Sequence, residues 1–79
     1  MALFLGVHTL PLPQGVTGSW ESYKEASANL GIKALHAYSS ADKGVAYCIT
    51  EAPSADTVRE AHKKADVPVN EVFEVVSAD

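Results

Sequence analysis

Cysteine is one of the scarcest residues in this sequence, and its scarcity limits how the fold can be held together. Cys48 is the only cysteine among 79 residues, so no disulfide can form within one chain. A lone thiol, in a chain with no signal-like segment, is typical of a protein kept in a reducing compartment. We therefore expect a cytoplasmic location.

Basic residues are also scarce, and no hydrophobic run is long. Six Lys and Arg residues stand against ten Asp and Glu residues, which gives a formal net charge of −4. A nucleic-acid-binding surface needs clustered positive charge to neutralise phosphates, so nucleic acid is not an expected partner. The apolar run at residues 1–7 is much shorter than the roughly 20 residues that span a bilayer, so we expect no membrane partner either.

Recognisable catalytic motifs are missing as well. Gly15 and Gly18 stand alone and form no glycine-rich phosphate loop, and no Ser-His-Asp or Cys-His order can be identified. We therefore expect a binding protein rather than an enzyme.

Apolar residues, in contrast, are plentiful at 47%. A chain of this length folds as one domain over residues 1–79, and it buries only about 60% of the surface that its unfolded form exposes. Such a small core is often supported by association with a second copy. We therefore expect a homodimer.

Hydrophobic periodicity predicts six elements. Strands are expected at residues 2–9, 33–39, about 45–51 and 72–76. Helices are expected from Ser19 to about Gly31 and from Ser54 to about Val67, with both serines as N-caps. The resulting β-α-β-β-α-β order predicts an α+β, ferredoxin-like fold: a four-stranded antiparallel sheet with two helices on one face and an open second face.

Strand alternation predicts which side chains share that open face. We expect odd-numbered residues of the first three strands to face the core and even-numbered residues to face outward. An outward face that carries aromatic and apolar groups is usually covered by a partner, which again favours a homodimer. The side chains expected on the open face are Phe4, His8, His36, Tyr38 and Cys48.

Several of these residues carry chemistry. With the first and third strands taken as parallel neighbours, His8, His36 and Glu51 would meet at one end of the sheet. Imidazoles, a thiol and a carboxylate suit a divalent transition metal. The candidate ligands are His36, His8, Glu51, Tyr38 and Cys48.

Each candidate also has a simpler interpretation. Tyr38 can be an aromatic dimer contact, and Cys48 can be a small buried hydrophobe that reacts slowly with thiol reagents. His62 is expected to be a solvated helix residue, so metal binding should depend on His36 more than on His62. Two other functions stay open: a cofactor-independent enzyme of the dimeric α+β barrel type, in which His36 or His8 would act on a small substrate, and a protein interaction module.

Four segments of the sequence carry a family resemblance. Residues 35–38 read Leu-His-Ala-Tyr, residues 47–53 read Tyr-Cys-Ile-Thr-Glu-Ala-Pro, residues 58–61 read Val-Arg-Glu-Ala, and residues 66–72 read Asp-Val-Pro-Val-Asn-Glu-Val. This pattern resembles a family of small bacterial proteins of unknown function, one branch of which is described as nickel-binding. The resemblance implies a ferredoxin-like fold, a homodimer and a nickel site. The residues that match the family pattern are His36, Tyr38, Cys48, Glu51, Ala52 and Pro53; Ala37 and Thr50 depart from its usual Ser and Tyr.

Overall fold

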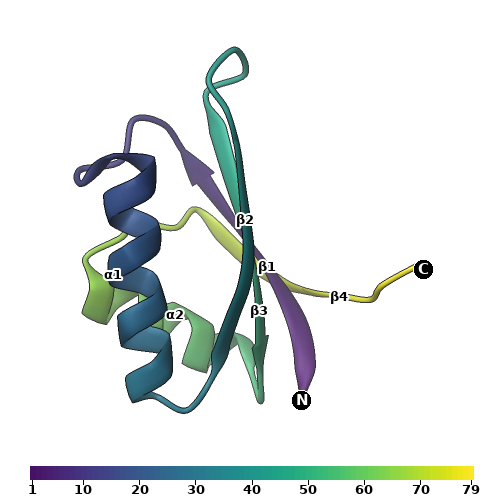
Figure 1. Ribbon diagram of the computed structural model, residues 1–79. Helices are drawn as coiled ribbons and strands as arrows, with labels where there is room; N and C mark the ends of the chain where they lie inside the picture. The colour runs from purple at the N-terminus through teal and green to yellow at the C-terminus, as the bar shows by residue number, and fades with distance from the viewer.

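The computed structural model describes residues 1–79 and contains four strands and two helices (Figure 1). The strands pair in the order β2-β3-β1-β4, and every neighbouring pair is antiparallel. The ferredoxin-like α+β fold expected from the sequence is therefore confirmed. In chain order the elements are β1 (Ala2–Thr9), α1 (Gly15–Asn29), β2 (Lys33–Ser40), β3 (Val45–Ala52), α2 (Ala55–Ala65) and β4 (Glu71–Val75).

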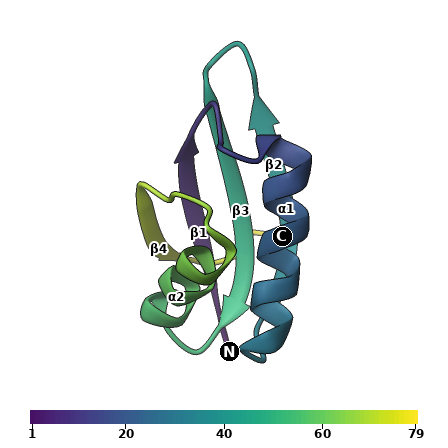
Figure 2. The same cartoon turned by 90° about the vertical axis from the view of Figure 1, so that its left-hand side faces the viewer.

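Both helices cover the same face of the sheet, and the other face carries no helix (Figure 1). Seen from the helix side, α1 lies over β2, while α2 lies over β3 and β4 (Figure 2). The site described below lies in the layer between these helices and the sheet. Neither helix is long and apolar enough to cross a membrane.

Helix α2 follows its sequence signals closely. Ser54 is its N-cap, and the Ser54 hydroxyl accepts a hydrogen bond from the Thr57 backbone N–H at 3.2 Å. Asp56 lies in the first turn, where its charge suits the helix dipole. The helix ends before Asp66, which adopts a left-handed conformation with φ of 58°.

Helix α1 begins at Gly15 rather than at Ser19, so the predicted start was wrong. The residue at its N-cap is Gln14, whose side chain makes no capping bond. Instead, the Gln14 amide donates to the Ala65 carbonyl at 2.9 Å and accepts from the Ser22 hydroxyl at 2.6 Å. The bond to Ala65 ties the start of α1 to the end of α2, and the bond from Ser22 holds the Gln14 side chain against α1. Ser19 is consequently buried one turn inside the helix.

The predicted faces of the sheet need correction. β1 runs antiparallel to β3, not parallel, and pairs Phe4 with Thr50 and His8 with Ala46. The even-numbered residues of β1 and β3 face the helices, and all of them except the half-buried Ala2 are buried. Phe4, His8 and Cys48 were expected on the open face, and their exposed fractions of 4–6% place them in the core layer instead.

A bulge in strand β2 explains why its two candidates, His36 and Tyr38, lie on the open face although Phe4, His8 and Cys48 do not. A bulge between Ala34 and His36 shifts the alternation by one residue, so Ala37 pairs with Cys48 and His36 pairs with Ile49. The expected placement of His36 and Tyr38 on the open face is therefore confirmed. The expected faces of β1 and β3 were reversed. A one-residue shift exchanges the two faces of a strand, so the bulge in β2 leaves His36 and Tyr38 on the face that was expected.

Candidate metal centre

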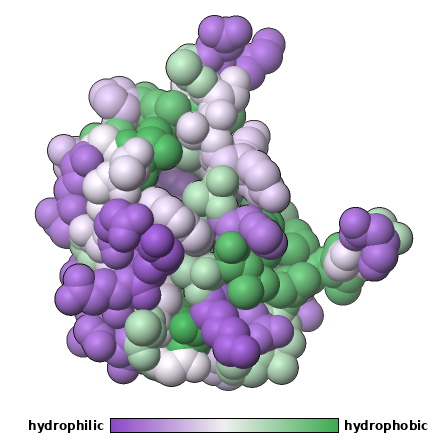
Figure 3. Space-filling model, viewed as in Figure 1, coloured by the Kyte–Doolittle hydropathy of each residue, from purple (hydrophilic) through white to green (hydrophobic).

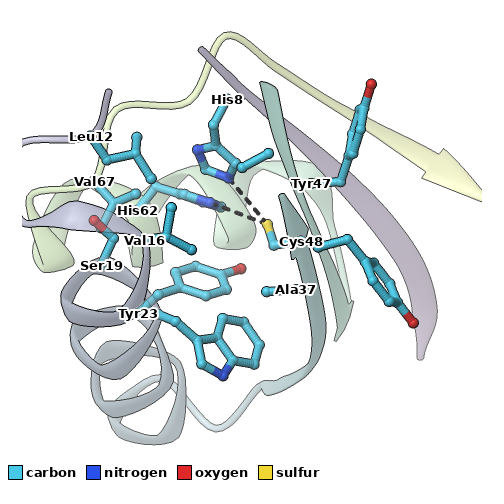
Figure 4. A pocket seen from close by; sticks show the side chains of 13 residues that line it. His8, Leu12, Val16, Ser19, Tyr23, Ala37, Tyr47, Cys48, His62 and Val67 are labelled. Atoms are coloured by element: carbon cyan, nitrogen blue, oxygen red, sulfur yellow. Dashed lines mark hydrogen bonds between the residues drawn. The ribbon is translucent and has the colours of Figure 1, made fainter. Parts of the chain in front are cut away.

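Three buried side chains from three elements converge between the helices and the sheet (Figure 4). His8 comes from β1, Cys48 from β3 and His62 from α2, and all three are at most 5% exposed. The Cys48 Sγ atom lies 3.5 Å from Nε2 of His8 and 3.5 Å from Nε2 of His62. The ligand atoms of the three residues lie within 4.8 Å of one another, so a single ion can contact all of them.

Backbone carbonyls set the orientation of both imidazole rings. Nδ1 of His8 lies 2.7 Å from the Pro68 carbonyl oxygen, and Nδ1 of His62 lies 2.8 Å from the Val58 carbonyl oxygen. A carbonyl oxygen can only accept, so each Nδ1 carries the ring hydrogen and each neutral ring has a lone pair on Nε2. Both lone pairs therefore face the sulfur of Cys48.

This arrangement has more acceptors than hydrogens. The Cys48 thiol supplies one S–H hydrogen, but the Nε2 atoms of both His8 and His62 can accept it. One Nε2 is therefore always left without a hydrogen, and a buried acceptor without a partner is costly. The cluster is thus suited to a cation that all three atoms can share.

A proton is poorly suited to be that cation at neutral pH. Burial lowers the pKa of His62, the Val58 hydrogen bond opposes this effect and the neighbouring His8 ring adds to it, so that the pKa is about 4. Burial likewise lowers the pKa of His8. Burial raises the pKa of the Cys48 thiol to about 11. The resting cluster is therefore neutral, with two imidazoles and a thiol.

Tyr23 of α1 closes one side of the cluster. Its ring centroid lies 4.2 Å from that of His62, and its hydroxyl shares a hydrogen bond with the Thr50 hydroxyl. Burial raises the pKa of Tyr23 to about 12. A cavity of about 30 Å³ adjoins the three residues, and apolar side chains such as Val16 and Trp20 line most of it.

The five candidates from the sequence are divided between the two faces of the sheet. His8 and Cys48 lie in the cluster. His36 and Tyr38 lie on the open face, with ring centroids 6.2 Å apart. Glu51 pairs with Leu3 and Lys33 at the far end of β3. The structure thus brings two of the five together and adds His62.

The expectation that His62 is solvated was wrong, because its side chain is 2% exposed. A sequence signal was present: His62 follows Val58 by four residues, and Val58 belongs to the inward stripe of α2. A histidine one helical turn from a core valine faces the same side of the helix. The two lysines that follow it, Lys63 and Lys64, had instead suggested a solvated face of the helix.

Comparisons with known proteins agree with this fold. The family model described as SCO4226-like, nickel responsive protein SCO4226-like, matches residues 4–75. The crystal structure of SCO4226 from Streptomyces coelicolor A3(2) superimposes with a TM-score of 0.85 and 24% sequence identity, over 98% of this chain and 100% of that one. At that identity the superposition establishes the shared fold. No curated protein matches the chain.

Proposed function

The chain belongs to the SCO4226-like family of nickel responsive proteins, and from this premise we propose that it binds a divalent transition metal, nickel first, through His8, Cys48 and His62. One observation carries the proposal. Two imidazole Nε2 lone pairs and one sulfur converge in a buried cluster that holds a single shared hydrogen. The proposed role is metal binding, without a catalytic step.

The donor set fits such an ion in its chemistry. Imidazole nitrogen is a good ligand for nickel, copper and zinc, and thiolate sulfur favours the softer members of that group. The Pro68 and Val58 carbonyls provide the second layer of hydrogen bonds that normally orients ligating histidines. When bound, the metal supplies a positive charge that replaces the thiol hydrogen.

Because the Cys48 pKa is raised by burial, the thiol is protonated at neutral pH and must lose its hydrogen when it becomes a ligand. Metal binding should therefore release about one proton per ion. Calorimetric titration with nickel in two buffers of different ionisation enthalpy measures that release. A site built from exposed carboxylates would release none near neutral pH.

Two histidines on opposite faces provide the matched test. We expect His62→Ala to weaken nickel binding by about tenfold or more, because a ligand is lost, whereas His36→Ala should bind like the wild type. Untagged protein is titrated with nickel, cobalt and zinc, and far-UV circular dichroism checks that both variants are folded. Loss of binding in His36→Ala with retention in His62→Ala would place the site on the open face.

We further propose that a second copy of the chain covers the open face. This face carries Tyr38, Phe73 and Tyr47 with exposed fractions of 62%, 43% and 37%, although each is a large aromatic side chain. In the view of Figure 3, hydrophobic side chains gather on the side of the sheet away from the helices. Side chains of Leu3, Leu5 and Val7 add to the same face and are only half-buried.

A symmetric dimer would bury this face by packing sheet against sheet. It would also supply the apolar burial that so short a chain lacks alone. Sedimentation equilibrium at micromolar concentration should give twice the chain mass of 8.4 kDa. A mass of one chain across the concentration range would rule out this assembly.

A further inference from the structure

Gly6 occupies a position where a glycine has no evident backbone reason to be. It lies in the middle of β1 and pairs with Cys48 on one side and Val72 on the other. The glycines with positive φ are Gly15, Gly31 and Gly44, so Gly6 has a conformation that any residue can adopt. A glycine inside a strand normally weakens it, and often marks a place where another group approaches closely.

The group that approaches Gly6 is the sulfur of the candidate metal centre. A Cβ atom built at Gly6 would lie 2.6 Å from Sγ of Cys48, which is too close for the sulfur to remain in place. The same Cβ would lie 3.5 Å from Cε1 and Nε2 of His62, which is ordinary van der Waals contact. A methyl group at this position would therefore displace the sulfur and spare the imidazole.

We propose that Gly6 is a positioning residue of the metal centre: its missing side chain leaves the space in which the Cys48 sulfur stands between the Nε2 atoms of His8 and His62. This inference rests on the proposed function for its metal-binding consequence. With a methyl group at residue 6, Cys48 must rotate about its Cα–Cβ bond and carry Sγ away. Both imidazoles would stay in place, because the Pro68 and Val58 carbonyls still hold their Nδ1 atoms.

A double-mutant cycle separates this role from a general effect on the fold. The variants are Gly6→Ala, Cys48→Ala and the two combined. Gly18→Ala serves as the control, because a Cβ there would meet only the Gln14 Cβ, at 3.4 Å. The readouts are the nickel and cobalt affinities and the near-ultraviolet absorption band that thiolate sulfur produces on either metal.

We expect Gly6→Ala to lower the metal affinity by about tenfold or more and to abolish the sulfur band, the range usual for disturbing the support of a ligand. In the Cys48→Ala background the same change should alter affinity by less than about twofold, because no sulfur remains to be displaced. Gly18→Ala should keep both affinity and band. An equal loss in both backgrounds, or an unchanged sulfur band in Gly6→Ala, would overturn the proposal.

The positioning of the sulfur can also be measured without metal. The Nε2 resonances of His8 and His62 in ¹⁵N NMR should shift in Gly6→Ala, because the S–H hydrogen moves away, and should not shift when Gly6→Ala is added to Cys48→Ala. If the wild type binds no metal, the proposed function fails while this cycle still decides the role of Gly6. Unmoved resonances in Gly6→Ala would then refute that role.

Discussion

The two faces of the sheet differ more in the size of their side chains than in their polarity. The helix-covered face is built largely from small residues, and its polar members are buried. The open face carries large aliphatic and aromatic side chains, many of them half-exposed. On β1 and β3 the covered face shows Ala2, Phe4, Gly6, His8, Ala46, Cys48, Thr50 and Ala52, while the open face shows Leu3, Leu5, Val7, Thr9, Val45, Tyr47, Ile49 and Glu51.

The difference reflects what covers each face. Small side chains on the sheet leave room for large ones from the helices, and Tyr23 and His62 fill that room. A buried space between two layers is where a thiol and two imidazoles can be held away from water. The open face has no helix above it, so its large apolar side chains can be buried only by packing against another surface. One face therefore holds the candidate site, and the other is suited to assembly.

The two phenylalanines test this division with the largest expected effect. Phe4 is 6% exposed on the covered face, and Phe73 is 43% exposed on the open face. Phe4→Ala should lower the free energy of unfolding by about 3–5 kcal/mol at every protein concentration, because it leaves a cavity in the core. Phe73→Ala should act mainly on the concentration dependence of unfolding. Urea denaturation at several protein concentrations measures both variants. If the two substitutions changed the free energy of unfolding and its concentration dependence equally, the proposed difference between the faces would be contradicted.

The next largest expected effect is the pH dependence of stability, which should differ between the buried His62 and the exposed His36. Burial lowers the pKa of His62 to about 4, whereas an unfolded histidine titrates near 6.5. Between these values the unfolded state binds more protons, so the free energy of unfolding of the metal-free protein should fall as pH drops from about 6.5 to about 4. At about 1.4 kcal/mol per pKa unit the loss from His62 is on the order of 3 kcal/mol.

Other groups titrate in the same range, so the measurement is a difference between variants. Denaturant unfolding at pH 7 and pH 4.5 is compared for the wild type, His62→Asn and His36→Asn. We expect His62→Asn to reduce the pH dependence by more than His36→Asn does, because the His62 side chain is buried and the His36 side chain is exposed. A wild-type slope retained in His62→Asn would show that this histidine is not buried in its neutral form.

Two tyrosines provide the smallest contrast. The buried Tyr23 hydroxyl shares a hydrogen bond with Thr50, whereas Tyr38 is 62% exposed. Tyr23→Phe removes one partner of a buried pair and should cost about 1–3 kcal/mol of unfolding free energy. Tyr38→Phe should change it by less than about 0.5 kcal/mol. Thermal unfolding of both variants checks the contrast, which would be lost if their midpoints moved equally.

Local signals were enough to predict the element order. Alternation marked β1 and β4, the Ser54 cap marked α2, and together they predicted the ferredoxin-like fold with one open face. These features depend on a few neighbouring residues. The start of α1 was missed because the long-range bonds of Gln14 to the end of α2, rather than a serine cap, accompany it.

The site was harder to predict because it depends on register. The bulge at Leu35 and the antiparallel pairing of β1 with β3 determine which residues meet, and neither has a strong local signature. Because Leu3, Leu5 and Val7 are apolar, the sequence predicted that they face the core, but their side chains lie on the face away from the helices. His8 and Cys48 were recognised as candidates, but their meeting with His62 requires α2 to be placed on the sheet.

The most direct test of the central claim is X-ray absorption spectroscopy at the nickel edge on the nickel-loaded protein, for the wild type, Cys48→Ser and His36→Ala. The proposed site predicts one sulfur and two imidazoles in the first coordination shell of the wild type. The sulfur should disappear in Cys48→Ser, and the spectrum of His36→Ala should match that of the wild type. A wild-type shell of nitrogen and oxygen alone, or one that changes in His36→Ala and not in Cys48→Ser, would contradict a metal centre at His8, Cys48 and His62.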